Sequence, residues 1–289
     1  MPTPQASDLT PGQIDRLVYA WKNHFFSADH ELKWIAAEVE HSVWLTSNTL
    51  LAGRIDTLGE NESGPFFGEW KTANPREAKT WKQVWRMNPQ SLTYGVLAND
   101  WFAANKQVAC SQFTVRKAFK STPPTFDHAW FSYDENELTH WRHQLIQIAD
   151  QIRGGGAGPW ETNWTACFQF GINYPCPHFE SGCSKMNWDV PVDAVRRVPH
   201  LDIERRLNED KNIIRTPGAI HTMELRIKVP DDLVILDATR VKDWFRCREM
   251  FRRNYVENVG TPMTEALQLG IDAHELWGNY YQSLVKETP

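Results

Sequence analysis

Three β-rich runs in residues 33–73 constrain the fold of this chain more than any other feature. The runs KWIAAEVEHSVWL, NTLLAGRIDTL and GPFFGEWKTA follow one another directly, separated by Ser-Asn and by the turn-forming GENESG. Short runs of β-branched and aromatic residues bounded by such turns are typical of neighbouring strands. The sequence therefore predicts a meander of three strands.

Helical patterns surround this meander. Thr10 and Pro11 suit the N-cap and first position of a helix that we expect to reach Phe26. Residues 75–102 are helical in pattern with a break near Pro89, residues 106–120 return to strand character, and residues 133–153 form an amphipathic pattern that stops at GGGAG. This order predicts an α/β sandwich built on one mixed sheet.

The composition of the chain changes after residue 184. Residues 185–236 are charged and punctuated by proline, which is typical of a long connector. Toward its end, ELRIKV and LVILDA have strand character. Residues 239–259 and 264–285 follow as two predicted helices.

Composition limits the classes of function. With 41% hydrophobic and 23% charged residues the chain is typical of a soluble globular protein, and its first residues lack the pattern of an export signal. We expect a cytoplasmic location and no membrane partner. A net charge of -5 disfavours a generally basic nucleic-acid coat, so any binding of nucleic acid must rest on local patches or on metal ions.

The segment GEWKT, residues 68–72, suggests chemistry on the third strand. Side chains alternate along a strand, so Glu69 and Lys71 are expected on one face and Trp70 on the other. A hairpin through GENESG can bring Asp56 beside Glu69. Two carboxylates and one lysine then share one edge of the sheet.

Such a group has a chemical and a simpler interpretation. Mg²⁺ prefers oxygen ligands, so two carboxylates and a backbone carbonyl such as that of Trp70 suit it, and Lys71 can orient a water for attack on phosphorus. The alternative is a cross-strand ion pair worth about 1 kcal/mol at most. Taken alone, Glu-x-Lys fits the ion pair better.

Gln90 and Tyr94 add to the set, because they lie one helical turn apart on one face. Together, GRID, EWKT and QSLTY resemble the core of PD-(D/E)XK nucleases, especially RecB-like exonucleases, including CRISPR-associated and phage members that carry an iron–sulfur cluster. The resemblance implies a restriction-endonuclease-like mixed sheet flanked by helices. It also implies a Mg²⁺- or Mn²⁺-dependent deoxyribonuclease. It makes Asp56 and Glu69 metal ligands, Lys71 the catalytic lysine, and Gln90 with Tyr94 the supporting pair.

The family also has an upstream helix with Gly-x-x-x-His-Glu, whose histidine completes the metal shell. Here that motif falls at the far end of the chain, in residues 270–275, and includes His274. The preceding RVKDWFRCREMFRRNYV resembles the family's opening segment and supplies Cys247. The resemblance therefore implies a circular permutation, although a swapped dimer or a truncated second copy gives the same order.

The resemblance also implies a cysteine-ligated metal-cluster subdomain, with Cys247 joined by Cys167, Cys176 and Cys183. Four thiolates can hold a [4Fe–4S] cluster or Zn²⁺, and His178 offers a mixed zinc site as the second choice. Residues 1–184 are then the nuclease core with three cluster cysteines, residues 185–236 the connector, and residues 237–289 the permuted helical segment. Cys110 is assigned to packing.

The segment around Cys247 also mixes cations with aromatic rings. We consider it the best local patch for nucleic acid, against the alternative of a solvated basic face over an aromatic core stripe, which we favour for the rings. The residues are Arg240, Lys242, Arg246, Arg248, Arg252 and Arg253 with Trp244, Phe245, Phe251 and Tyr255.

These observations predict a metal-dependent DNA nuclease, an exonuclease acting at DNA ends or on single strands. Two other functions fit the same residues: a DNA-binding or scaffolding module without turnover, and a site-specific endonuclease. The expected partners are DNA, proteins of recombination, repair or CRISPR adaptation, and a second copy of the chain.

Overall fold

A computed structural model describes most of the segments that carry the predicted elements. The described residues are 19–25, 31–73, 85–103, 108–116, 125–155, 195–196, 231–256, 259–260 and 265–287. Among them, residues 19–25 are helical, within the helix expected before the meander. The strand predicted at ELRIKV lies outside the described residues.

The core of the fold is a six-stranded mixed sheet. Its strands are β1 (Lys33–Thr46), β2 (Thr49–Asn61), β3 (Gly64–Ala73), β4 (Val108–Arg116), β5 (Thr125–Tyr133) and β7 (Val234–Leu236). The first three form the predicted antiparallel meander, while β4 runs parallel to β3 and β5 antiparallel to β4. The predicted mixed sheet is confirmed, and β5 is an additional strand that we did not predict.

Two different strands pair with the same edge of β2. Its pairing with β1 extends over nearly its whole length, so β3 and β7 must both lie on its other edge. β7 pairs with Thr49, Leu50 and Leu51, whereas β3 pairs from Thr57 onward. Among the described strands, residues 52–56 therefore lie in register with neither β3 nor β7, and the sheet opens beside Asp56.

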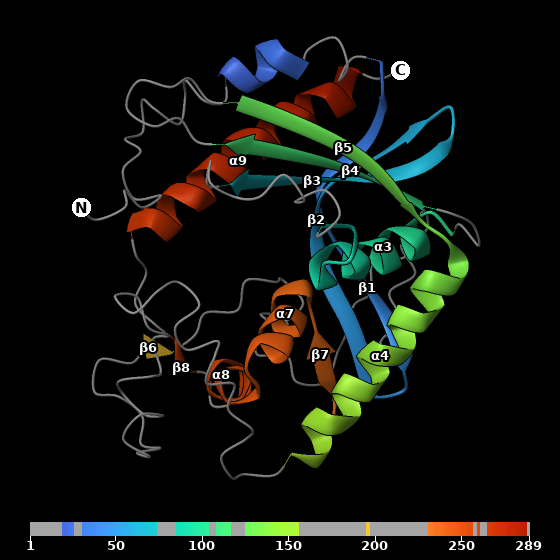
Figure 1. The fold of residues 1–289 in the computed structure, drawn as a ribbon, viewed down its shortest axis with the longest axis vertical. Coiled ribbons are helices and arrows are strands. Elements are labelled where there is room, and N and C mark those ends of the chain that lie inside the picture. The colour runs from blue at the N-terminus through green and yellow to red at the C-terminus, as the bar shows by residue number, and fades with distance from the viewer. Residues whose placement is uncertain are drawn as a thin grey trace.

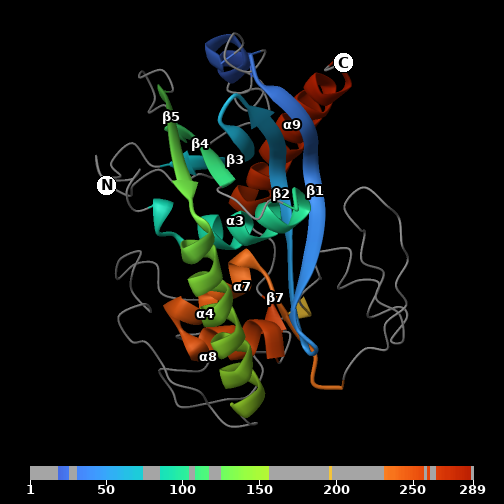
Figure 2. The same cartoon turned by 90° about the vertical axis from the view of Figure 1, so that its right-hand side faces the viewer.

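Helices cover both faces of the sheet (Figures 1 and 2). One core cluster joins β2 and β3 to α3 (Pro89–Trp101), α4 (Glu135–Gly154) and α7 (Ala238–Arg246). The other joins the opposite face to α9 (Glu265–Glu287) and residues 19–25. Side chains on the two faces of β3 contribute to different clusters. Phe67 belongs to the first cluster, and Phe66 and Trp70 belong to the second.

The C-terminal segments complete both cores within one chain. Val241 and Trp244 are buried in the first cluster, and Trp277 and Tyr281 in the second. The stacking of Trp70 on Tyr281, with ring centroids 4.2 Å apart, ties the Glu-x-Lys strand directly to α9. Two further short strands, β6 (Val195–Arg196) and β8 (Val259–Gly260), pair with each other.

The single helix predicted over residues 239–259 is wrong. α7 ends at Arg246, Cys247 adopts an extended conformation, and α8 (Arg248–Phe251) and the π-helical η4 (Arg252–Val256) follow. The break lets the second segment fold back, because the Tyr255 hydroxyl donates to the Asp243 carboxylate at 2.9 Å. In a continuous helix, twelve residues would separate their backbones by roughly 18 Å.

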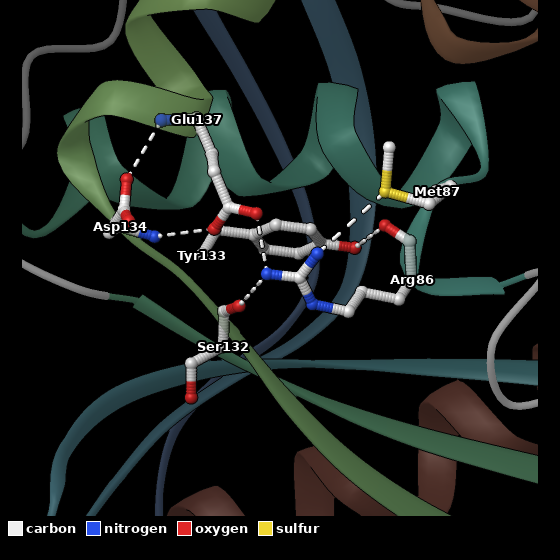
Figure 3. Close-up of polar contacts among 6 residues, drawn as sticks. All are labelled: Arg86, Met87, Ser132, Tyr133, Asp134 and Glu137. Atoms are coloured by element: carbon white, nitrogen blue, oxygen red, sulfur yellow. Dashed lines mark hydrogen bonds and ion pairs between the residues drawn. The ribbon is translucent and has the colours of Figure 1, made fainter.

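The starts of α3 and α4 are fastened to each other (Figure 3). The Arg86 guanidinium donates to the Ser132 carbonyl oxygen and to Glu137, while the Tyr133 hydroxyl donates to the Arg86 carbonyl oxygen at 2.9 Å. Glu137 also closes the capping box of α4 with Asp134. Two residues after Arg86, Asn88 caps α3 and Pro89 occupies its first turn, so this network sets where α3 begins.

No helix among the described residues is both long and apolar enough to cross a membrane.

The burial of Trp277 makes α9 part of the cooperative fold. We expect Trp277→Ala, which removes an indole that is 1% exposed, to lower the free energy of unfolding by about 3–5 kcal/mol. Ile271→Ala in the same helix is the control, because its side chain is 44% exposed and a change below about 1 kcal/mol is expected. Urea unfolding of both variants measures the difference. A small effect of Trp277→Ala would contradict the packing of α9 on the sheet.

Candidate active site

Asp56 and Glu69 lie where β2 and β3 separate. The last paired residues are Thr57 and Gly68, so Asp56 and Glu69 occupy the next positions of the register. Beyond that point the Trp70 N–H donates to Asp56 Oδ2 at 3.0 Å, in place of a backbone ladder bond. The predicted proximity is present, although β2 continues past Asp56 to Asn61.

Glu69 is held by α3. The Gln90 side-chain amide donates to Glu69 Oε1 at 2.9 Å, and Glu69 is fully buried. Gln90 is placed by the start of its helix, where its own N–H donates to the Asn88 side chain at 2.9 Å. A buried carboxylate must be stabilised by donors or by cations, and Gln90 supplies one such donor.

Tyr94 lies one helical turn beyond Gln90, and the charges of both carboxylates affect the pKa of its phenol. Burial first, and then the charges of Glu69 and Asp56, raise the pKa of the Tyr94 phenol well above its usual value, against a lowering by the Gln90 hydrogen bond. The phenol therefore keeps its proton and remains a donor. Gly53 makes room for the ring, because a Cβ there would lie 3.3 Å from Tyr94 Cε1.

The structure thus brings four of the predicted residues together: Asp56, Glu69, Gln90 and Tyr94. Lys71 has its backbone in β3, paired with Thr114 of β4, but its side chain lies outside the described residues. His274 has its backbone in α9, and its side chain also lies outside the described residues.

Glu38 is a further acidic residue here, and sequence reasoning missed it. The β1–β2 register pairs Ala37 with Thr57 and Val39 with Ile55, which places Glu38 opposite Asp56. Its backbone has a φ of 52°, in the left-handed region that residues with a side chain rarely adopt. The segment AEVEH alternates like an ordinary strand, so only the register distinguishes Glu38.

The Glu38 carboxyl has contacts on two sides. Arg54 Nε lies 3.4 Å from its Oε2, and Gly278 of α9 packs against its side chain. Burial first, and then the negative charge of Asp56, raise the pKa of Glu38 to about 7, while Arg54 acts in the opposite direction. The Asp56 carboxylate therefore adds to the effect of burial in disfavouring a negative charge on Glu38.

The donor set of Asp56 and Glu69 suits a hard divalent cation. Both are buried carboxylates at neighbouring register positions, and Mg²⁺ or Mn²⁺ takes such oxygens while retaining several waters. Within the described part of the chain, no group of three or more His, Cys, Asp or Glu residues is arranged to hold a metal ion. The two carboxylates therefore account for only part of a coordination shell.

The cysteines divide into a described and an undescribed set. Cys110 is fully buried in the core, which confirms its assignment to packing. Cys247 is also buried and forms no disulfide with another described cysteine, and it lies at the break between α7 and α8. The other predicted cluster ligands, and the alternative zinc ligand, lie outside the described residues: Cys167, Cys176, Cys183 and His178.

The basic segment belongs in part to the core. Trp244 and Phe251 are buried in the first cluster, which confirms the core interpretation for these rings. Arg240 forms an ion pair with Asp237, and Arg252 is only 4% exposed. Phe245 differs, because it is 53% exposed although its ring stacks on Trp141.

The raised pKa of Glu38 predicts a pH-dependent stability difference. A carboxyl with a pKa raised from 4.5 to about 7 loses its contribution to stability as the pH rises through 7, because the charged form is disfavoured by folding. In cation-free buffer, Glu38→Gln should therefore exceed the wild type in stability at pH 8, by about 2 kcal/mol, and the gap should close toward pH 5. Thermal unfolding across this pH range measures it.

The matched control is Glu60→Gln, which alters a half-exposed carboxylate on β2 that is paired with Lys33 at 2.8 Å. No comparable gain at pH 8 is expected from it. An equal gain in both variants would show that general charge reduction, rather than the environment of Glu38, is responsible.

Comparisons with known proteins bear on this site. A family model described as the PD-(D/E)XK nuclease superfamily matches residues 7–181, more than half of the chain. No curated protein matches the chain significantly. One solved structure, titled "Crystal structure of SSO0001", is 14% identical, with 48% of this chain and 61% of that chain covered and a TM-score of 0.24. The chain thus spans less than two thirds of that structure. On the family match, the chain belongs to the PD-(D/E)XK nuclease superfamily.

Proposed function

We propose that the protein is a metal-dependent DNA nuclease of the RecB-like type, an exonuclease that hydrolyses phosphodiester bonds at DNA ends or in single strands. One observation carries the proposal: the Glu69 carboxylate is fixed by Gln90 directly beside Asp56, at the opening between β2 and β3. An ordinary cross-strand ion pair has no need of two buried carboxylates at adjacent positions.

Cation binding, orientation of the attacking water and positioning of the ligands fall to different residues of the site. Asp56, Glu69, the Trp70 carbonyl oxygen and His274 would hold Mg²⁺ or Mn²⁺. When bound, such an ion supplies Lewis acidity and lowers the pKa of a coordinated water. Lys71 orients the attacking water, Gln90 keeps Glu69 in place, and Tyr94 remains a protonated donor beside both carboxylates.

A circular permutation explains the order of these parts. Under this proposal residues 1–184 are the nuclease core, residues 185–236 the connector, and residues 237–289 the segment that completes the core. The burial of Trp244 in one cluster and of Trp277 in the other supports completion in cis.

We further propose that Cys247 joins Cys167, Cys176 and Cys183 in holding a [4Fe–4S] cluster, with Zn²⁺ as the second candidate. The position of Cys247 at the break between α7 and α8 supports this role. DNA is the proposed substrate, and recombination, repair or CRISPR adaptation are the processes in which an end-directed nuclease would have partners.

Nuclease activity is tested with labelled linear single- and double-stranded DNA in Mn²⁺ or Mg²⁺. We expect the wild type to cleave, and Lys71→Ala and Glu69→Gln to lower the rate by about a hundredfold or more, because each removes a group that acts on the developing charge. Glu60→Gln on β2 should retain full activity.

Circular DNA separates the alternatives in the same assay. An exonuclease leaves circles intact, whereas a site-specific endonuclease cuts them at discrete positions. DNA binding without cleavage by the metal-loaded wild type would favour the scaffolding module, and undiminished cleavage by Lys71→Ala would refute the proposed site.

The cluster is tested by anaerobic purification. The protein should be brown, with broad absorbance near ~400 nm that is lost in Cys247→Ser, as expected for iron–sulfur thiolate ligation. Cys110→Ala is the control, because that thiol is assigned to packing, and it should retain both colour and iron. Colourless wild-type protein with stoichiometric zinc would contradict the iron–sulfur assignment.

A further inference from the structure

We propose that Glu38 is a positioning residue of the nuclease site, which couples Asp56 on β2 to His274 on α9. This rests on the proposed function, because it takes His274 as a cation ligand. The contact that carries it joins β1 to α9, the helix that contains His274: a Cβ added at Gly278 would lie 2.7 Å from Glu38 Cγ and 3.1 Å from its Oε1.

The backbone of β1 is distorted at this point. A φ of 52° is a strained conformation for a residue with a side chain, and it persists only where the surroundings enforce it. Here the surroundings are the Asp56 register position on one side and α9 on the other. The distortion is therefore located where the sheet, the acidic site and the helix meet.

Gly278 determines how closely α9 approaches. Any side chain at this position would displace Glu38, since the added carbon would lie closer than real Cβ contacts allow. His274 precedes Gly278 by four residues, which is one helical turn, so both lie on the same side of α9. The Glu38 contact therefore fixes the part of the helix that bears His274.

One oxygen of the Glu38 carboxylate is available to accept a hydrogen bond from an imidazole N–H. Its Oε2 is near Arg54 Nε, at 3.4 Å, while its Oε1 is buried and accepts no hydrogen bond within the described structure. Metal-binding histidines commonly donate their second ring N–H to a carboxylate, which orients the ring and raises its basicity. Among the described residues, Glu38 is an acidic residue that contacts α9 one turn from His274.

Cation binding tests this inference independently of catalysis. Mn²⁺ affinity, measured by electron paramagnetic resonance of free Mn²⁺ at pH 8, should fall about tenfold in Glu38→Gln, the range expected when a carboxylate behind a ligand is lost. His274→Ala should also weaken binding, and the double variant should be no weaker than His274→Ala alone, because both changes act through one ligand. Gly278→Ala should lower the affinity in the same direction, and Glu60→Gln should leave it unchanged.

The outcomes separate this inference from the proposed function. Wild-type affinity in Glu38→Gln, or losses that multiply in the double variant, would overturn the role of Glu38 while leaving the nuclease site intact. Wild-type affinity in His274→Ala would instead remove the ligand on which both proposals depend. Because Glu38→Gln is expected to be at least as stable as the wild type at pH 8, unfolding does not explain a loss of Mn²⁺ binding.

Discussion

The hydrogen bond from the Trp70 N–H to the Asp56 carboxylate is the constraint on which the site depends. It occurs where β2 and β3 stop pairing, so a side chain takes over the role of the backbone ladder. With β3 held in this way, its alternation places Glu69 against Gln90 of α3 and Trp70 against Tyr281 of α9. One short stretch of strand therefore connects an acidic site to both layers of helices.

The opening beside Asp56 needs the C-terminal part of the chain. β7 occupies the start of the β2 edge and β3 occupies its end, so residues 52–56 lie between two strands that are more than 160 residues apart in the sequence. Asp237, which follows β7 and caps α7, also contributes to raising the pKa of Tyr94. Removing the last segments would thus disturb the electrostatics of the site as well as both cores.

The resemblance to PD-(D/E)XK nucleases singled out Asp56, Glu69, Gln90 and Tyr94 as a set. Local patterns in the sequence predicted the meander, the break near Pro89 where α3 begins, and the helix that includes α4. These features depend on alternation, capping and helical spacing, which short segments determine by themselves. The break at Cys247 was not predictable in this way, because it is stabilised by the distant pairing of Tyr255 with Asp243. Glu38 was missed for a similar reason, since its importance arises from strand register and from Gly278 of a helix at the other end of the chain.

The electrostatics of the site favour the binding of a cation. Burial first, and then the negative charge of Asp56, raise the pKa of Glu38. Burial first, and then the charges of Glu69 and Asp56, raise the pKa of Tyr94, so the site disfavours negative charge on both neighbours. Among the described residues, Arg54 is the counter-ion within reach of Glu38, and it is half-exposed. A buried excess of negative charge disfavours the folded state unless positive charge joins it. A divalent ion would relieve this repulsion, so affinity for the ion and instability without it share one physical origin.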